Sequence, residues 1–374
     1  MQLSRVESLF HENFNYFGEL GAAISIWQNG KSILELHGGF RDAKRESPWT
    51  ENTIVPLWSA TKGLGSACLL HLFQEHQIDL GQRVAQFWPE FGASGKREIT
   101  LAHLLSHQAG LCALDRPVDL FDYPAVITAI EQQAPLWPPG TAHGYHARTF
   151  GFLLDELMRR IGKVTIGQYW RTTFADPLHL DIWIGLPESE NHRVATVYAA
   201  KAGKTAEPRQ FYADLATPGT FVRRVFTSPR GLPAISSIND PKVLGASFVS
   251  FGAIGSATSL AKFYAMLANN GELDGHRFFT QKTLQQMTTT LVSGIDLVFQ
   301  IPTAFSAGFM KDPPAVSRRM FGPSSIAFGH PGAGGIHAFA DLGHGISFAY
   351  AMNQLEASLL PNDKSVRLIA AVYH

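Results

Sequence analysis

The sequence predicts an α+β protein in which both ends of the chain build one sheet and a mostly helical block is inserted between them. An amphipathic helix and a β-hairpin open the chain, and three strands followed by a helix close it. The long stretch between these ends is helical or irregular and is punctuated by proline and glycine. We therefore expect one α/β domain formed by residues 1–78 and 236–374, and an inserted, mostly helical domain formed by residues 79–235.

The opening helix and hairpin have the clearest local signals. Apolar residues recur near one face over residues 3–17, which is the spacing of an amphipathic helix. The stretch Gly21–Gln28 is typical of a buried strand, Asn29-Gly30 is a strong two-residue hairpin signal, and Ser32–His37 returns as the partner strand. A long helix is expected from about Ser59 to His76, with one face formed by Leu64, Ala67, Cys68, His71 and Leu72.

The remaining elements follow from shorter patterns. In the middle block, residues 100–106 and 149–161 are expected to be helical, whereas residues 200–235 are expected to be a loop. A helix is then expected from Ser256 to the stop signal at Asn270-Gly271. The closing elements are predicted as strands at residues 326–328, 336–341 and 346–352 and a helix at residues 365–373.

Composition and charge exclude several classes of protein. Of the 374 residues, 45% are hydrophobic and 17% are charged, a globular composition that is too apolar for a disordered chain. Lys and Arg together number 31, and so do Asp and Glu, so the chain has no overall attraction for nucleic acid or anionic lipid. Arg223, Arg224 and Arg230 form the best local patch of positive charge, but this patch is too small to predict such a partner.

Cysteine content and hydropathy indicate the compartment. Cys68 and Cys112 are the only cysteines, too few for a disulfide framework or a four-cysteine zinc site, and we expect two buried, reduced thiols. The N-terminal residues are polar from the start, so no secretory signal is evident, and no run of about 18 apolar residues predicts a membrane helix. We expect a soluble, cytoplasmic protein with no membrane or nucleic-acid partner, and the sequence leaves its oligomeric state open.

The segment Ser59-Ala60-Thr61-Lys62 carries the strongest chemical signal. Residues three apart on a helix lie about 5–6 Å from each other on one face, so the lysine can lower the pKa of a neighbour or, if burial makes it neutral, remove a proton itself. Unpaired N–H groups of the first helical turn can also bind a developing oxyanion. The simpler role for Ser59 is that of a helix N-cap. A second Ser-x-x-Lys, Ser259 to Lys262, is expected to be a chance match inside an amphipathic helix.

Two further segments can complete such a site. Tyr145 follows a Pro-Gly turn, and its phenol is a plausible base if a nearby cation such as Lys62 lowers its pKa; the alternative is a packed aromatic ring. The glycine-rich run Phe328–Gly335 lets a ligand or another backbone approach closely, or it is a tight turn between strands. A backbone N–H in this run can supply a second oxyanion donor.

Signals for other chemistries are weak. The sequence contains no Gly-x-Ser-x-Gly elbow, no phosphate-binding P-loop and no His-Glu-x-x-His zinc motif. His103 and His107 are four residues apart, a possible metal spacing, but no clear third ligand accompanies them and a structural role is favoured. We therefore expect neither a metal nor an organic cofactor.

Taken in order, the three segments resemble the serine β-lactamase and penicillin-binding-protein superfamily, and they are most similar to class C β-lactamases and the related family VIII carboxylesterases. Ser59-Ala60-Thr61-Lys62 looks like the first motif of that superfamily. Tyr145-His146-Ala147 stands where the family has Tyr-x-Asn, and His330-Pro331-Gly332 stands where it has Lys-Thr-Gly. The stretches Thr100–Leu111 and Asp181–Pro187 also look familiar, so the resemblance extends from about residue 20 to residue 355.

The resemblance implies an antiparallel sheet flanked by helices, with the active site in the groove between this domain and the inserted one. It also implies a serine hydrolase, in which Ser59 attacks a carbonyl and Tyr145, with its pKa lowered by Lys62, accepts the serine proton and passes it to the leaving alcohol. The remaining roles that it implies are oxyanion binding by the backbone N–H groups of Ser59 and Ala333 and contact with the substrate by His330 and Gly332.

Two departures from the family pattern favour a small carboxylic ester as the substrate. Ala147 has no group to hold an amide side chain, and His330 would be mostly neutral at pH 7 where the family has a fixed cation. Losing both anchors disfavours amide-bearing, anionic substrates but leaves the acyl-transfer machinery in place. The alternatives are a β-lactamase or D-amino-acid peptidase, an acyltransferase that passes the acyl group to an alcohol, and a non-catalytic binding protein on the same fold.

Overall fold

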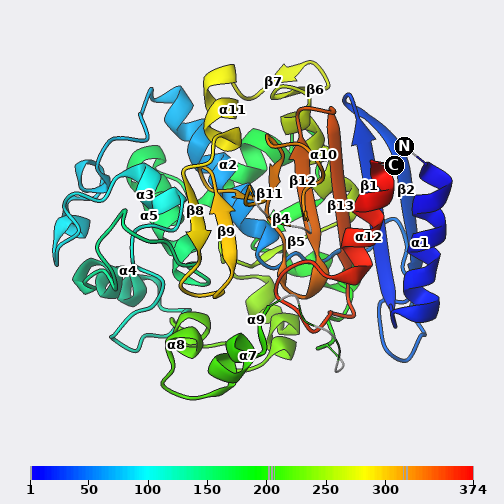
Figure 1. Cartoon of the computed structure of the whole chain (residues 1–374), viewed down its shortest axis with the longest axis horizontal. Helices are drawn as coiled ribbons and strands as arrows, with labels where there is room; N and C mark the ends of the chain where they lie inside the picture. Colours follow the sequence, from blue (N-terminus) through cyan, green and yellow to red (C-terminus); the bar gives the residue numbers. More distant parts are fainter. Residues whose placement is uncertain are drawn as a thin grey trace.

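One eight-stranded antiparallel sheet runs through the molecule (Figure 1). The computed structural model describes residues 2–200, 203, 205, 207–314, 316 and 319–373. In spatial order the strands are β2 (Lys31–Gly39), β1 (Gly21–Gln28), β13 (Ile346–Met352), β12 (His337–Asp341), β11 (Phe328–Gly329), β10 (Met310–Lys311), β9 (Pro302–Phe305) and β8 (Val292–Ile295). Because β1 pairs with β13, both ends of the chain build one sheet, and the predicted α+β class with an antiparallel sheet flanked by helices is confirmed.

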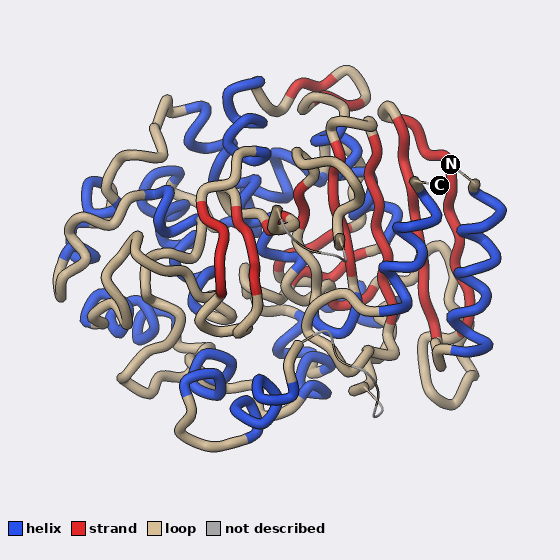
Figure 2. Tube along the Cα trace, in the orientation of Figure 1, coloured by secondary structure: helices blue, strands red, loops and turns tan. Residues whose placement is uncertain are grey.

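Helices cover both faces of this sheet (Figure 2). The hydroxyl of Ser347 in β13 donates to the carbonyl of Ala261 in α10 (Ala257–Ala268) at 2.8 Å, which places α10 on one face. Tyr350 of the same strand points to the opposite face, where its hydroxyl accepts from Asn13 of α1 (Leu3–Tyr16) at 3.2 Å. Helix α12 (Asp363–Val372) lies beside α1 on that face (Figure 1).

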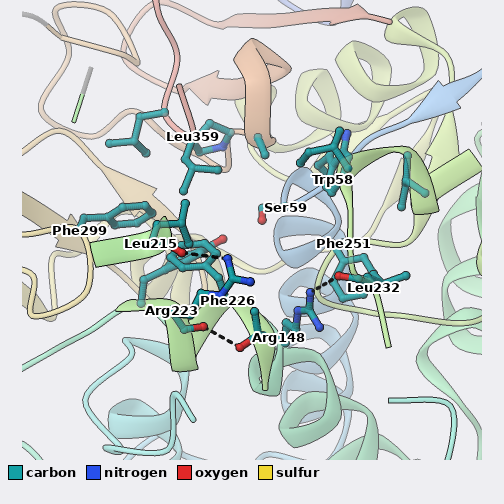
Figure 3. A pocket seen from close by; sticks show the side chains of 18 of the residues that line it. Trp58, Ser59, Arg148, Leu215, Arg223, Phe226, Leu232, Phe251, Phe299 and Leu359 are labelled. Atoms are coloured by element: carbon teal, nitrogen blue, oxygen red, sulfur yellow. Dashed lines mark hydrogen bonds between the residues drawn. The ribbon is translucent and has the colours of Figure 1, made fainter. Parts of the chain in front are cut away.

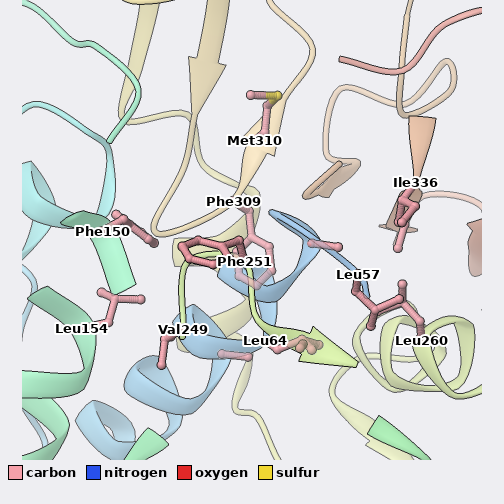
Figure 4. Close-up of a cluster of buried hydrophobic side chains, with 14 of the residues drawn as sticks. Leu57, Leu64, Phe150, Leu154, Val249, Phe251, Leu260, Phe309, Met310 and Ile336 are labelled. Carbon is pink, nitrogen blue, oxygen red and sulfur yellow. The ribbon is translucent and has the colours of Figure 1, made fainter. Parts of the chain in front are cut away.

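Helix α2 (Ala60–Glu75) forms the buried centre of the molecule. Most of its residues are buried, so it has no solvent-facing side of the kind an amphipathic helix shows. Figure 4 shows Leu64 of α2 within a cluster of apolar side chains that includes Val249 and Phe309. A Cβ at Gly63 would lie 2.5 Å from the hydroxyl of Tyr264, so glycine lets α10 approach α2 closely.

A second, three-stranded sheet fixes the entry to α2. It contains β3 (Val55–Pro56), β5 (Ala253–Gly255) and β4 (Ile182–Ile184) in that order. The N–H of Leu57 then donates to the carbonyl of Ala253 at 2.8 Å, which ties the residues just before α2 to β5. In this sheet β4 comes from the expected helical domain, whereas β3 and β5 come from the expected α/β domain. The domain boundaries expected from the sequence stay a prediction.

Shorter elements complete the chain. The remaining helices are α3 (Leu101–Leu105), α4 (Tyr123–Gln132), α5 (Thr149–Gly162), α6 (Ile166–Trp170), α7 (Arg209–Ala216), α8 (Phe221–Thr227), α9 (Pro241–Leu244) and α11 (Gln281–Thr288), and the strands β6 (Glu272–Leu273) and β7 (His276–Arg277) form a small hairpin. None of the helices in the described part of the chain is long and apolar enough to cross a lipid bilayer. Both cysteines are free and buried, as expected.

The expectation of a loop over residues 200–235 is wrong, because this stretch contains α7 and α8. Each helix is short and buries few apolar side chains, Phe211 in α7 and Val222 and Val225 in α8, so its apolar periodicity is weak. A side-chain cap stabilises the start of α8, where the Thr220 hydroxyl accepts from the N–H of Arg223.

Candidate active site

The turn that opens α2 presents the Ser59 hydroxyl. Ser59 directly precedes the helix, and Trp58 before it has a left-handed backbone conformation with φ of 49°. Ser59 occupies the N-cap position that the sequence leaves open, but its side chain makes no capping hydrogen bond to the helix. The hydroxyl is therefore available to groups outside the helix backbone.

Lys62 lies one turn further along α2 and is completely buried. Its Nζ lies 3.4 Å from Oγ of Ser59 and donates to the carbonyl oxygens of Ala147, at 2.9 Å, and Ser250, at 2.8 Å. Burial lowers the pKa of Lys62 well below its usual range, and no carboxylate in the described part of the chain opposes this shift. A neutral Lys62 would donate its two N–H groups to the two carbonyls and turn its lone pair toward Ser59.

Tyr145 completes a group of three side chains drawn from distant parts of the chain. Its side chain is almost fully buried, Nζ of Lys62 lies 4.8 Å from the centre of its ring, and its hydroxyl interacts with the Ser59 side chain. The expectation that Lys62 lowers the pKa of Tyr145 is wrong, because burial raises the pKa of the phenol and the nearby Asp296 carboxylate raises it further. The same burial lowers the pKa of Lys62, and Lys62 is not among the groups that lower the pKa of Tyr145.

A buried carboxylate, Asp296, holds the backbone on which Tyr145 sits. One oxygen of Asp296 accepts from the N–H groups of Tyr145, at 3.2 Å, Val298, at 2.7 Å, and Phe299, at 3.0 Å. Its other oxygen accepts from the Thr303 hydroxyl at 3.2 Å. Asp296 cannot be predicted from the sequence, because a single acid 151 residues away from its partner gives no spacing signal.

The glycine-rich run packs against the turn that opens α2 and forms another wall of the same cavity. His330 is buried, its Nδ1 donates to the carbonyl of Pro331 at 2.9 Å, and burial, assisted by Lys62, lowers its pKa to about 3. The expected neutral histidine is therefore confirmed. Gly332 lies behind this wall rather than on it: its N–H donates to Ile336 at 2.8 Å, and a Cβ there would lie 2.5 Å from the carbonyl oxygen of Leu57.

Two residues that line the same cavity have a backbone N–H without a protein partner. Ser59 and Ala333 both line it. Within the residues that the structure describes, the N–H of neither donates to a protein acceptor. Two unpaired N–H groups beside a serine hydroxyl are the arrangement that stabilises the oxyanion of an acyl-transfer intermediate.

The cavity at this site has a volume of about 770 Å³. Figure 3 shows Ser59 facing the open space, with apolar side chains around it. These come from the turn before α2, from α7 and α8, and from later loops; they include Trp58, Leu215, Phe226, Phe251, Phe299 and Leu359. Helices α7 and α8, in a stretch expected from the sequence to be a loop, thus supply part of the cavity wall.

The weaker candidates have structural roles. In the second Ser-x-x-Lys, the Ser259 hydroxyl accepts from the N–H of Asp181 at 2.8 Å, and Lys262 pairs with Asp274 at 2.8 Å, so the chance-match interpretation holds. Nδ1 of His103 accepts from the N–H of Thr100 at 3.4 Å, within the cap of α3. No cluster of three or more His, Cys, Asp or Glu suited to a metal ion occurs among the described residues.

Comparison with known proteins agrees with this geometry. The family model described as Beta-lactamase matches residues 10–371. The curated protein "Esterase/beta-lactamase LipL" of Mycobacterium tuberculosis is 28% identical over 367 residues, which cover 95% of this chain and 81% of that protein.

Two solved structures are similar over nearly their whole length. A penicillin-binding-protein homolog from Caulobacter crescentus is 35% identical with a TM-score of 0.88, and 99% of this chain and 96% of that chain are covered. A family VIII carboxylesterase is 34% identical with the same TM-score of 0.88, and 99% of this chain and 96% of that chain are covered. The resemblance stated from the three sequence segments is thereby confirmed.

Proposed function

This chain belongs to the Beta-lactamase family, and from that premise we propose that it is a serine carboxylesterase, which cleaves small carboxylic esters through an acyl-enzyme on Ser59. It is a hydrolase of the β-lactamase fold, with carboxylesterases among its structural neighbours. The observation that carries the proposal is the placement of Lys62, whose Nζ lies 3.4 Å from Oγ of Ser59 while its two other partners are carbonyl oxygens.

The proposed first step moves one proton and makes one bond. The lone pair of neutral Lys62 takes the proton of the Ser59 hydroxyl as Oγ bonds to the ester carbonyl carbon. The negative charge that develops on the carbonyl oxygen is held by the N–H groups of Ser59 and Ala333, and losing such a donor typically costs about 10²–10³ in rate.

The second step releases the alcohol. As the intermediate collapses, the ester C–O bond breaks and the leaving oxygen takes a proton from the Tyr145 phenol, which is replenished from Lys62. The raised pKa of Tyr145 suits this role, since a phenol that holds its proton at neutral pH acts as a donor rather than as the initial base. Water then attacks the acyl-enzyme by the same route in reverse and frees Ser59.

The composition of the site supports an ester over a β-lactam. Ala147 presents no side-chain hydrogen-bonding group, and His330, with a pKa of about 3, is uncharged at neutral pH. An amide side chain and a carboxylate next to the reacting carbonyl would therefore find no polar anchor at these two positions. Ester cleavage needs neither anchor.

The proposal is tested by intact-mass analysis after mixing with a panel of p-nitrophenyl esters and β-lactams. We expect an acyl adduct from the esters on the wild-type protein and none on Ser59→Ala. Lys62→Met should lower kcat/KM by about 10²–10⁴. The second Ser-x-x-Lys offers matched controls: Ser259→Ala and Lys262→Met alter the same residue types outside the cavity and should keep full activity.

Several results would contradict the proposal. Turnover by Ser59→Ala would exclude Ser59 as the nucleophile. Faster capture of a cephalosporin than of any simple ester would favour the β-lactamase alternative. An acyl group passed to added alcohol in preference to water would favour an acyltransferase, and failure of every ester and β-lactam to label the protein would favour the non-catalytic alternative.

A further inference from the structure

The cavity that opens at the start of α2 is also lined by three arginines, which the proposed reaction does not use. Arg148 precedes α5, Arg223 lies in α8, and Arg230 follows α8. None of the described residues that line this cavity is acidic. Burial lowers the pKa of His330 to about 3, so among the described residues that line this cavity the three guanidinium groups carry the positive charge.

The three arginines differ in how fully they are used by the protein. Arg148 donates to the carbonyl oxygens of Pro229, at 2.6 Å, and Leu232, at 3.2 Å, so it holds the segment after α8 in place. Figure 3 shows Arg148 beside Leu232. Arg223 makes one such contact, to the carbonyl of Leu215 at 3.1 Å, out of five N–H donors that a guanidinium carries.

Neither Arg223 nor Arg230 has a carboxylate partner within the described part of the chain. The neighbouring Arg224 does, since it pairs with Asp115 at 2.7 Å. Asp115 thus pairs with the arginine that lies outside the main cavity, and the two arginines without a carboxylate partner line it.

Arg223 and Arg230 stand where the apolar cavity meets a second hollow. Together with Thr227 they line both the main cavity and an adjoining one of about 430 Å³. Both arginines are exposed, so a charged group placed between them keeps contact with water while an apolar chain behind it is buried. This arrangement avoids the cost of burying a charge completely.

We propose that the ester that enters this site carries an anionic group, such as a carboxylate, at the far end of an apolar chain, and that Arg223 and Arg230 bind this group. The inference rests on the proposed esterase function and names its substrate class. Guanidinium groups bind carboxylates through short, charge-assisted and often paired hydrogen bonds, which fits two unpaired arginines at the end of an apolar cavity.

This inference changes one expectation drawn from the sequence. Loss of the fixed cation at His330 disfavours an anion next to the reacting carbonyl, and that argument is local to position 330. The arginines belong to a different segment, α8 and the residues after it, and lie on a wall shared with the outer hollow. The preferred anion is therefore remote from the bond that is cleaved.

The experiment compares esters that differ only in a terminal carboxylate. On the acyl side, the p-nitrophenyl hemiester of adipate is paired with p-nitrophenyl hexanoate, and that of suberate with octanoate. On the alcohol side, para-carboxyphenyl hexanoate is paired with its neutral para-carbamoylphenyl analogue. For the arm that matches the natural substrate, we expect kcat/KM to be about tenfold higher for the anionic ester than for its neutral partner. The difference should arise mainly from KM, because a group far from the reacting bond strengthens the binding of substrate and transition state equally.

Variants then assign the preference to the two arginines. The readout is the ratio of kcat/KM for the anionic ester to that for its neutral partner. Arg223→Gln and Arg230→Gln should each lower this ratio about threefold to tenfold, as expected of partly exposed charge pairs, and the double variant should remove the preference. Arg223→Lys should retain most of it. Arg224→Gln, the adjacent arginine with its own acidic partner, is the matched control and should leave the ratio unchanged.

The outcomes separate this inference from the function on which it rests. Salt at about 0.5 M should shrink the preference in the wild-type protein, since the pairs face solvent. A wild-type enzyme that turns over the neutral esters but shows no anionic preference in either arm overturns the inference and leaves the esterase function standing. A preference that survives in the double variant overturns the assignment to Arg223 and Arg230. Absence of turnover of every ester overturns the proposed function itself.

Discussion

Replacing Asp296 by asparagine would measure the cost of burying a carboxylate behind Tyr145. The carboxylate is fully buried and accepts three backbone N–H groups through one oxygen. Burial nevertheless outweighs these hydrogen bonds and raises the pKa of Asp296 from 3.8 to about 6. Asparagine keeps an acceptor oxygen in the same place, and its amide can donate to the Thr303 hydroxyl, so the variant preserves the network without the charge.

The size and sign of the effect follow from this pKa. Below about pH 3 both the folded and the unfolded chain hold the proton, and Asp296 has no effect on stability. As the pH rises from about 4 to 7, the unfolded chain releases the proton first, so the wild-type protein loses stability relative to the variant. A shift from 3.8 to about 6 corresponds to about 3 kcal/mol. Asp296→Asn should therefore be more stable than the wild type by up to about 3 kcal/mol at pH 8 and nearly equal to it at pH 4.

Denaturant unfolding of both proteins at several pH values between 4 and 8 is the assay. The difference between the two unfolding free energies isolates Asp296, because every other titrating group is shared. Asp296→Ala serves as the contrast: it leaves three buried N–H groups without an acceptor and should be destabilised at every pH, by about 1–3 kcal/mol for each group. A difference between wild type and Asp296→Asn that does not change with pH would refute a raised pKa at this position.

Two further predictions concern Lys62 and the carbonyl groups around it. Gly151→Ala should destabilise the protein by about 1–3 kcal/mol, because a Cβ there would overlap the backbone nitrogen of Ser250. The variant should also lower kcat, because the carbonyl of Ser250 accepts from Lys62. Unfolding curves would detect the first effect and ester kinetics the second. Gly38→Ala is the control and should change stability little, because a Cβ there would make ordinary contacts with Phe14, at 3.6 Å, and Phe10, at 3.9 Å. The pH profile of kcat/KM should reach its plateau well below the ~10.4 of an ordinary lysine, because burial lowers the pKa of Lys62; a plateau reached only above about pH 10 would contradict a neutral base.

Those parts of the fold that depend on local signals could be predicted from the sequence. The hairpin of β1 and β2 follows from Asn29-Gly30 between two apolar runs, and α1 follows from its regular apolar spacing. Strands β8 to β10 and helices α7 and α8 could not, because each is short and its apolar residues follow only a weak period. Their stability comes from contacts with segments far away in the sequence.

The candidate site divides in the same way. Ser59 and Lys62 are three residues apart on one helix, and this spacing alone predicts their proximity. The protonation state of Lys62 cannot be predicted from the sequence, because its carbonyl partners lie 85 and 188 residues away and its burial depends on the whole core. The direction of the Tyr145 pKa was wrong for the same reason, since it depends on desolvation rather than on which residues are neighbours.

The pairing of β1 with β13 determines when the enzyme can assemble during its synthesis. Ala22 in β1 pairs with Met352 in β13, 330 residues later. While the ribosome is still making the middle of the chain, the inner edge of β1 has no partner and exposes its hydrogen-bonding groups to other strands. Ser59 and Lys62 are among the early residues to emerge, yet the strands that frame their cavity arrive near the end of translation, so the nascent chain acquires its chemistry only as its last strands dock.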